Sequence, residues 1–165
     1  MIQLRRLGSK GVTFVEILLV MGLLSIFLVV MTTIFTSALD VQTQSETYSA
    51  TLSDGRFIMA RLNYDISRAT AVTTPAALGA AGTSLVLTIN ATPYTFAVVG
   101  SNLQLTDPTG SANLTGGTSI SSVSFQRLGN VGGKDTVRYT FILSSLARNE
   151  GVSNTQTFTS TAELR

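Results

Sequence analysis

One ionisable side chain, Glu16, lies in an otherwise uncharged run that extends from Val12 to Phe35. About 20 apolar residues are enough to cross the roughly 30 Å hydrocarbon core of a membrane as a helix. A carboxylate deep inside such a span costs about 2.5–3.5 kcal/mol. Glu16 is therefore expected either to lie near the lipid headgroups, as in a plain signal-anchor helix, or to meet a cation supplied by another subunit.

No second group of side chains suggests catalysis or metal binding. The sequence has no His and no Cys, which excludes His-based triads, the usual zinc ligands and disulfide bonds. Asp107 and Asp135 lie in polar, glycine-rich stretches, but calcium needs about six or more oxygen ligands. Ser and Thr have no base to activate them, and the glycosylation sequon Asn113-Leu114-Thr115 carries little weight. We predict no enzyme activity, no cofactor and no metal.

The charges on either side of the uncharged run predict its orientation. Arg5, Arg6 and Lys10 precede it, whereas Phe35–Gly55 contains acids and no Lys or Arg. The positive-inside rule then places the N-terminus in the cytoplasm and the rest of the chain outside. An ordinary secretory signal ending near Thr36-Ser37-Ala38 is the competing interpretation, but its apolar region would far exceed the usual length of about 7–15 residues.

The junction Lys10-Gly11-Val12-Thr13-Phe14-Val15-Glu16 resembles the leader junction of type IV prepilins. In that family a short basic leader ends in Gly, a prepilin peptidase cuts after it, the new N-terminal residue is N-methylated, and the fifth residue after the cut is Glu. Gly11 matches the last leader residue, Val12 the new terminus, where Phe or Met is more usual, and Glu16 the fifth position. The resemblance implies cleavage between Gly11 and Val12, N-methylation of Val12, and a role for Glu16 in neutralising the Val12 ammonium of an adjacent subunit.

Cleavage at this junction would remove the excess positive charge of the chain. The full sequence has 11 basic and 9 acidic residues, a net charge of +2. The leader 1–11 holds three of the basic residues and no acid, so the mature chain carries 8 − 9 = −1. Composition therefore gives no support for a nucleic-acid partner.

The helix is expected to continue beyond the membrane as far as Thr70. One stripe of residues recurs at alternating steps of four and three, and we expect this stripe to lie on a β-sheet. Gly22 and Gly55 are the weakest points, each costing about 1 kcal/mol relative to Ala in a helix interior. The stripe consists of Val41, Ser45, Tyr48, Leu52, Gly55, Met59, Leu62, Ile66 and Ala69.

The end of this helix is similar to the "L-x-x-D-I-x-x-A" segment of J-type minor pseudopilins and W-type minor pilins. The matching positions are Leu62, Asp65, Ile66, Arg68 and Ala69. The simpler alternative is an amphipathic helix end with solvated charges, in which Asp65 pairs with Arg61 or Arg68 for about 0.2–0.5 kcal/mol. The resemblance implies a minor subunit that initiates or tips a type II secretion pseudopilus or type IV pilus. Its partners would be the prepilin peptidase, other pilins or pseudopilins, and an inner-membrane assembly platform.

Val72–Gly82 is predicted to be a linker, in which Pro75 prevents further helix. The rest of the chain is predicted to form β-strands. Three strands, Ser84–Ile89, Pro93–Val99 and Ser101–Thr106, are separated by short turns and predict an antiparallel meander. A polar loop that begins with Asp107-Pro108-Thr109-Gly110 and includes Gly116-Gly117 follows them.

A second β-group begins near Ser119 and reaches Leu128. After a turn at Gly129–Gly133, the segment Asp135–Ser144 returns with the clearest two-residue alternation in the chain. A loop at Leu146–Asn154 and a Thr-rich last strand, Thr155–Leu164, complete the sequence.

The sequence therefore predicts an α+β fold: a long N-terminal helix packed on antiparallel β-sheet. We expect a leader at 1–11, a membrane and assembly helix at 12–35, the exported half of the helix at 36–71, and a β-rich domain at 72–165. The mature protein would cross the cytoplasmic (inner) membrane once before entering a pilus or pseudopilus. The alternative is a single-pass, signal-anchored protein whose extracytoplasmic β-domain binds a ligand.

Overall fold

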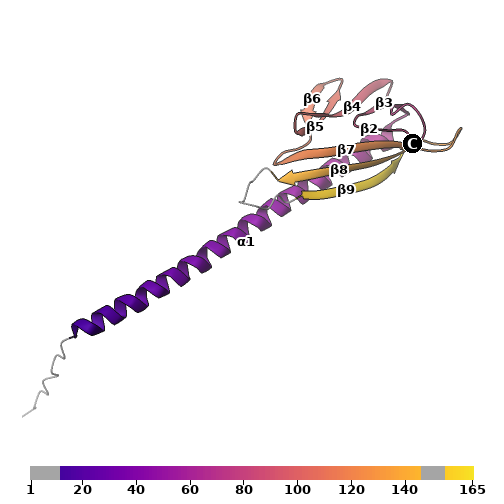
Figure 1. Ribbon diagram of the computed structural model, residues 1–165. Helices are drawn as coiled ribbons and strands as arrows, with labels where there is room; N and C mark the ends of the chain where they lie inside the picture. Colours follow the sequence, from indigo (N-terminus) through magenta and orange to yellow (C-terminus); the bar gives the residue numbers. More distant parts are fainter. Residues whose placement is uncertain (1–11, 146–154) are drawn as a thin grey trace, which may run out of the picture. The chain divides into compact units, whose positions relative to one another are not determined.

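The computed structural model describes residues 12–145 and 155–165. These residues form one helix and nine strands (Figure 1), and the chain divides into two compact units, Met1–Gln42 and Thr43–Arg165. The predicted leader and the predicted loop at Leu146–Asn154 lie outside the described residues. The α+β prediction is confirmed, because a long helix packs on antiparallel sheets.

The first unit contains the N-terminal part of helix α1, which as a whole is Phe14–Arg68. The helix begins at a Thr-x-x-Glu sequence: the Glu16 amide donates to Thr13 Oγ1 at 3.3 Å, and the Ile17 amide donates to the Thr13 carbonyl at 3.2 Å. A Thr at this position caps the helix by satisfying an amide that has no partner within the helix. Among the described residues, α1 is the one helix long and apolar enough to span a membrane.

In the second unit, α1 contributes one buried side to the domain. The predicted stripe is confirmed from Gly55 onward, since Leu62, Ile66 and Ala69 are also buried. It is wrong for the stripe's first residues, because Val41, Ser45 and Tyr48 are exposed. The sheet therefore covers α1 only from about Thr51, and the helix ends at Arg68, not at Thr70.

The first sheet has five antiparallel strands, and its central three confirm the predicted meander. Its two outer strands were not expected. β1 forms inside the predicted linker because Val72 pairs with Leu87 and is buried, and β6 follows a tight turn in which the Thr109 amide donates to Asp107 Oδ1 at 2.8 Å. In spatial order the strands are β1 (Ala71–Thr74), β3 (Leu85–Ile89), β4 (Thr92–Val99), β5 (Asn102–Asp107) and β6 (Gly110–Asn113).

The second sheet has four antiparallel strands, in the order β2 (Ala81–Gly82), β7 (Thr118–Leu128), β8 (Thr136–Ser145) and β9 (Thr155–Glu163). The predicted alternation is confirmed in β8, where every second side chain from Val137 to Leu143 is buried. Strand β2 was also assigned to the linker; it adds to β7 through two residue pairs. Its brevity leaves no periodicity for a sequence pattern to detect.

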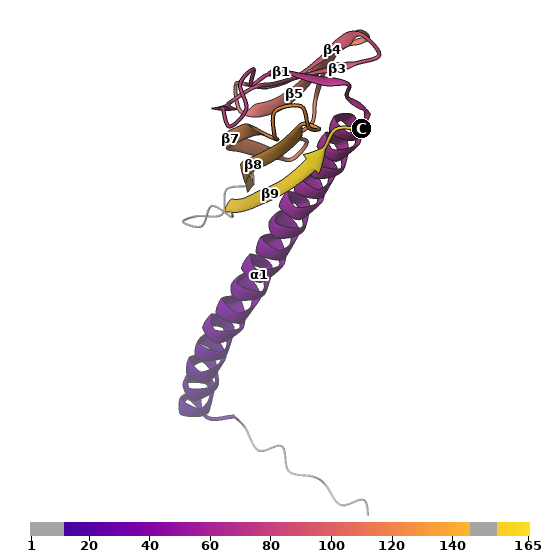
Figure 2. The same cartoon turned by 90° about the vertical axis from the view of Figure 1, so that its right-hand side faces the viewer.

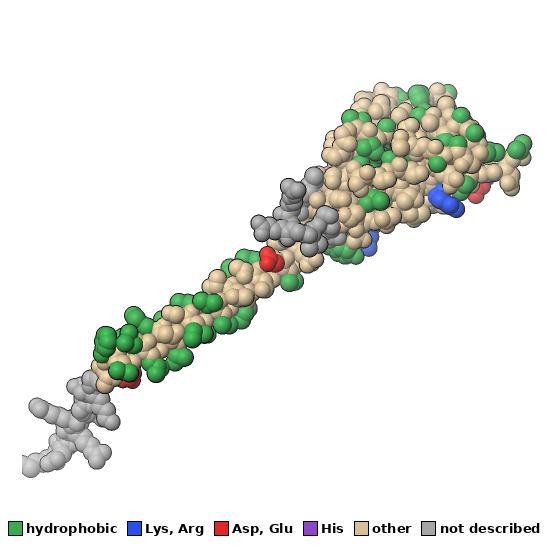
Figure 3. All heavy atoms as spheres, viewed as in Figure 1, with side chains coloured by type: hydrophobic (Ala, Val, Ile, Leu, Met, Phe, Trp, Pro, Cys, Tyr) green, Lys and Arg blue, Asp and Glu red, His purple; other side chains and the backbone are tan. Residues whose placement is uncertain are grey.

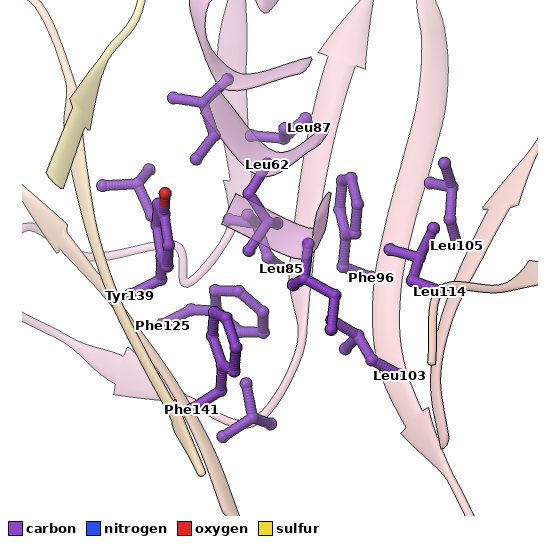
Figure 4. Packing of buried hydrophobic residues seen from close by; sticks show 14 of the residues in the cluster. Leu62, Leu85, Leu87, Phe96, Leu103, Leu105, Leu114, Phe125, Tyr139 and Phe141 are labelled. Carbon is purple, nitrogen blue, oxygen red and sulfur yellow. The ribbon is translucent and has the colours of Figure 1, made fainter. Parts of the chain in front are cut away.

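Both sheets and the C-terminal part of α1 enclose one apolar core (Figures 2 and 4). Ile58, Leu62 and Ile66 of α1 are completely buried against residues of both sheets. Each large apolar side chain that leaves water in this way contributes about 1.5–3 kcal/mol. Figure 4 shows the labelled members Leu62, Leu85, Leu87, Phe96, Leu103, Leu105, Leu114, Phe125, Tyr139 and Phe141.

Candidate functional site

The N-terminal end of α1 contains the residues for which the sequence suggests chemistry. Val12 and Thr13 precede the helix, and Val12 is exposed. Gly11 and the basic residues of the predicted leader, Arg5, Arg6 and Lys10, lie outside the described residues. Because the cap comes from Thr13, cleavage between Gly11 and Val12 would leave the start of the helix intact.

Glu16 lies in the first turn of α1 and is exposed. Among the residues that the structure describes, it takes part in no ion pair. A carboxylate in a first turn interacts favourably with the positive end of the helix dipole, typically by about 0.3–1 kcal/mol. Glu16 can therefore serve the helix dipole of its own chain, or it can pair with a cation of another molecule. Losing the first interaction would cost about 0.3–1 kcal/mol, whereas breaking a buried ion pair would cost about 3–5 kcal/mol.

The part of α1 from Phe14 to Phe35 exposes apolar side chains along the face seen in Figure 3. From Phe14 to Phe35, its large hydrophobic side chains are between 45% and 75% exposed. Soluble monomeric proteins rarely expose a contiguous apolar surface larger than a few hundred Å². This segment therefore requires a covering that the described chain does not provide.

Asp65, singled out by its place in the minor-subunit resemblance, is completely buried. Its Oδ2 accepts a charge-assisted hydrogen bond from Arg61 Nε at 2.6 Å, while Oδ1 has no protein partner in the described part of the chain. Arg68, the other predicted partner, lies instead over the Tyr64 ring at 4.7 Å. The predicted pairing of Asp65 with Arg61 is confirmed, whereas the expected solvation of Asp65 is wrong. The pairing with Arg61 compensates the buried charge.

A second carboxylate of α1, Asp54, joins the helix to a distant loop that sequence reasoning did not connect with it. Asp54 Oδ2 accepts hydrogen bonds from the Gly116 and Gly117 amides, both at 3.1 Å, and from Thr118 Oγ1 at 2.8 Å. A Cβ on Gly116 would lie 3.5 Å from Asp54 Oδ1. That is ordinary van der Waals contact, and a Cβ on Gly117 would meet nothing within 4 Å, so the Gly-Gly pair gave no sequence signal for this contact.

The two aspartates considered for calcium have other partners. Arg127 binds Asp135 through two parallel contacts, Nε to Oδ1 at 3.0 Å and Nη2 to Oδ2 at 2.8 Å, and also donates to the carbonyls of Val72 and Ala76. Hydrogen bonds from Thr109 lower the pKa of Asp107. In residues 12–145 and 155–165, no three Asp, Glu, His or Cys side chains lie together as a metal site.

Comparison with protein-family models, curated proteins and solved structures finds no match. The described part of the chain offers an exposed apolar helix with one acidic side chain near its start, and a folded β-domain around the helix's other end.

Proposed function

We propose that this protein is a pilin-like structural subunit that is cleaved after Gly11 and assembles through the N-terminal part of α1. The observation that carries the proposal is the exposed, apolar helix that begins just after the Gly11–Val12 junction, with Glu16 in its first turn. Before assembly, the membrane would cover this helix, with the N-terminus in the cytoplasm and the β-domain outside. In the filament, neighbouring helices would replace the lipid.

Glu16 acts in this proposal on the new N-terminus of an adjacent subunit. Cleavage creates an ammonium group at Val12, which remains cationic after N-methylation. In an apolar bundle of helices, an unpaired ammonium or carboxylate is strongly unfavourable, whereas the pair is tolerated. The pair would therefore select the register between subunits more than it would add stability.

The finer proposal is a minor subunit, of the J-type or W-type, that initiates or tips the filament. It is supported by the resemblance of Arg61–Ala69, in which Leu62 and Ile66 enter the core and Asp65 is buried. The subunit would work with an inner-membrane assembly platform and with other pilins or pseudopilins. If it is minor, quantitative mass spectrometry of sheared filaments should find it rare beside a major subunit; finding it as the bulk of the fibre would contradict this assignment.

The main test is processing by a prepilin peptidase. Co-expression should shorten the chain by residues 1–11 and leave a methylated Val12, both of which are visible in the intact mass. Gly11→Leu should block the cut, because the added side chain would obstruct the peptidase subsite, whereas Gly8→Leu is the matched control within the leader and should be cut. An uncut wild-type chain beside an active peptidase would contradict the proposal and favour the anchored monomer.

A further inference from the structure

Strand β9 is an outer strand of its sheet (Figures 1 and 2), and it differs from the other outer strands that the structure describes. Strands β1 and β6 have four residues each, β2 has two, and the pairing of β1 contains a register shift. Strand β9 has nine residues, contains no Pro or Lys, and pairs with β8 without a register shift. Shortness, bulges, Pro and Lys are the usual means by which proteins protect an edge from further pairing. β9 is therefore the outer strand that is most open to pairing.

No described strand pairs with the other side of β9 from Thr157 to Glu163, and we call this side the free edge. In an outer strand, alternate residues direct their main-chain N–H and C=O groups away from the neighbouring strand. Another extended chain offers N–H and C=O groups at the matching spacing. The free edge thus specifies the backbone conformation of a chain that binds it.

The apolar core is incompletely covered next to this edge. The inward side chains of β8, from Val137 to Leu143, are fully buried, whereas those of β9 are only half-buried. Among the described residues, four partly buried hydrophobic side chains pack against the core. Three of them belong to β9 or to the turn of α1 beside it, and we call these three, Met59, Phe158 and Ala162, the open row.

Helix α1 runs beside β9 in the same direction. A Cβ on Gly55 would overlap the Phe158 ring. One turn further along α1, the Met59 carbonyl is 3.3 Å from the hydroxyl of Tyr139, the residue that pairs with Ser160 of β9. The open row therefore follows the border between α1 and β9.

We propose that an extended segment of a different protein binds the free edge of β9 as a further strand of this sheet. Its main chain would satisfy the unpaired groups of the free edge, and its side chains would alternate between two environments. Apolar side chains that face the core would cover the open row, and polar side chains would lie beside the exposed Thr157, Thr159 and Thr161. The partner is therefore recognised by its extended conformation and by its alternation of apolar and polar residues.

A second copy of this chain does not fit the edge as well. If two β9 strands paired antiparallel, the helices beside them would point in opposite directions, because α1 and β9 run the same way. Two chains that cross one membrane through the same helix point the same way, so this step rests on the proposed function. If the two strands paired in parallel through the same edge, their open rows would face opposite sides of the joined sheet, and neither row would be covered.

A synthetic peptide with the sequence of β8, Thr136–Ser145, tests the free edge, because β8 is the strand that β9 already accepts on its other side. Lysines added at the peptide ends keep it soluble, and the fluorescence anisotropy of a labelled peptide reports its binding to the full-length chain in detergent. A disulfide between Thr140→Cys and Thr159→Cys would prevent the peptide from replacing β8. These two residues are cross-strand partners with Oγ1 atoms 3.1 Å apart, and the natural chain has no Cys. We expect the peptide to bind this locked chain.

N-methylated peptides test whether the contact is main-chain pairing. Alternate amides of a strand point to opposite edges, so a peptide that is methylated at one alternate set loses the donors of one edge only. With its apolar side chains directed to the core, the peptide can meet β9 through only one of its edges. One methylated peptide should therefore bind as the unmodified peptide does, and the other should bind about tenfold more weakly, which corresponds to about 1.4 kcal/mol. Equal binding of all three peptides, or no binding of the unmodified one, would overturn the proposal.

Two variants of β9 form a matched pair. Ala162→Lys places a charge on the inward side of the free edge and should weaken binding by about tenfold, since inward-pointing charges are a natural means of blocking an edge. Thr161→Lys adds the same charge at the preceding position, on the exposed outer side, and should bind the peptide as wild type does. Equal binding by the two variants would place the peptide away from the open row and overturn the proposal. If urea unfolding shows that Ala162→Lys does not fold, the methylated peptides decide the question, because they leave the protein unchanged.

The size of the full-length chain in detergent tests the choice of partner. A dimer that the peptide dissociates would show that a second copy occupies the free edge, and it would overturn the assignment to a different protein. Peptide binding itself needs no prepilin peptidase. A chain that is correctly cut but does not bind the peptide therefore contradicts this inference alone, whereas an uncut chain that binds the peptide contradicts the proposed function alone.

Discussion

The two ends of α1 belong to one helix but bury their apolar side chains in different ways. From Phe14 to Phe35 every large hydrophobic side chain is exposed, whereas Ile58, Leu62 and Ile66 are completely buried by the two sheets. The folded chain therefore uses only one end of its helix to build its own core. The N-terminal end therefore requires a covering, lipid or other helices, that the described part of the chain does not provide.

Asp65 and Glu16, the carboxylates at the two ends of α1, also differ in whether the chain itself provides their partner. Asp65 is buried, and Arg61, one turn away on the same helix, compensates it at 2.6 Å. Glu16 lies among exposed apolar side chains, and no described residue forms an ion pair with it. Under the proposed function, Glu16 acquires in the assembled state the compensation that Asp65 already has in the single chain.

The largest expected effect concerns this difference. Glu16→Gln should leave membrane insertion and cleavage intact, because it removes a charge from an apolar span. Association of subunits should weaken by about 3–5 kcal/mol, a hundredfold or more, because the Val12 ammonium of the neighbour would be buried without a counter-charge. Crosslinking of subunits in the membrane, with cleavage followed by intact mass in the same sample, measures both effects.

Asp40→Asn is the matched control, since it removes a carboxylate from the exposed part of α1 beyond the uncharged run. It should not change association by more than a small amount. If Glu16→Gln is processed and crosslinked as well as wild type, Glu16 serves only the helix dipole, for which about 0.3–1 kcal/mol is the ordinary contribution.

The next effect is in the C-terminal part of α1, where Asp54 accepts hydrogen bonds from the Gly116-Gly117 loop. Asp54→Ala should lower the free energy of unfolding of the domain by about 1.5–3 kcal/mol, the range for hydrogen bonds to a charged group. Asp54→Asn should cost less, because an amide oxygen can still accept one of the three bonds. Urea unfolding of the full chain in detergent, followed by tyrosine fluorescence, provides the measurement; a loss below about 0.5 kcal/mol for Asp54→Ala would show that the loop is held by other contacts.

Gly22 and Gly55 of α1 differ in the space that is available for an added side chain. Nothing lies within 4 Å of a Cβ added at Gly22, but a Cβ at Gly55 would lie 2.2 Å from Phe158 Cζ. The Phe158 ring also stacks on Phe141 at 5.2 Å, which restricts its movement. Gly55→Ala should therefore destabilise the domain by about 1–2 kcal/mol through overpacking, although Ala favours a helix by about 1 kcal/mol over Gly.

Gly22→Ala is the control and should leave the unfolding midpoint of the domain unchanged. A double variant, Gly55→Ala with Phe158→Ala, should lose less stability than the sum of the single variants, because the clash requires both side chains. Additive losses would place the cost of Gly55→Ala somewhere other than the Phe158 ring.

These two glycines also show how far the sequence could predict this structure. Period-2 alternation in β8 and the apolar steps from Gly55 onward predicted the sheet and the buried side of α1, because burial imposes those periods directly. Gly55 itself was interpreted as a weak point of the helix, since its partner, Phe158, is distant in sequence. The short strands β1, β2 and β6 were missed for a similar reason: they are defined by pairing with neighbours and have little pattern of their own.

The residues of the candidate site differ in the same way: some are recognisable from local spacing, and others only from the folded structure. Gly11, Val12 and Glu16 are recognisable because their spacing is local, and their roles remain predictions. Asp54 and Arg127 could not be identified, since their partners at Gly116 and Val72 are brought close only by the fold. Local chemistry could thus be predicted from the sequence, whereas contacts between distant segments required the structure.

The smallest expected effect concerns Tyr139, which connects β8 to the buried side of α1. Its hydroxyl donates to Asn63 Oδ1 at 2.8 Å and lies 3.3 Å from the Met59 carbonyl, and burial raises its pKa above the ordinary value of 10.0. Tyr139→Phe keeps the ring and should cost about 0.5–1.5 kcal/mol at neutral pH through the lost hydrogen bond.

Ionisation of the Tyr139 hydroxyl provides a second, independent test. The unfolded chain ionises this tyrosine near pH 10, whereas the folded domain does so only at higher pH, so the wild-type domain must lose stability as the pH rises above about 10. The Phe variant has no ionisable hydroxyl at this position, so it does not lose stability in this way. The difference in free energy of unfolding between the two proteins should therefore narrow above about pH 10. Urea midpoints measured from pH 7 to pH 11 would test it; a constant difference across this range would show that the folded domain does not resist ionisation of Tyr139.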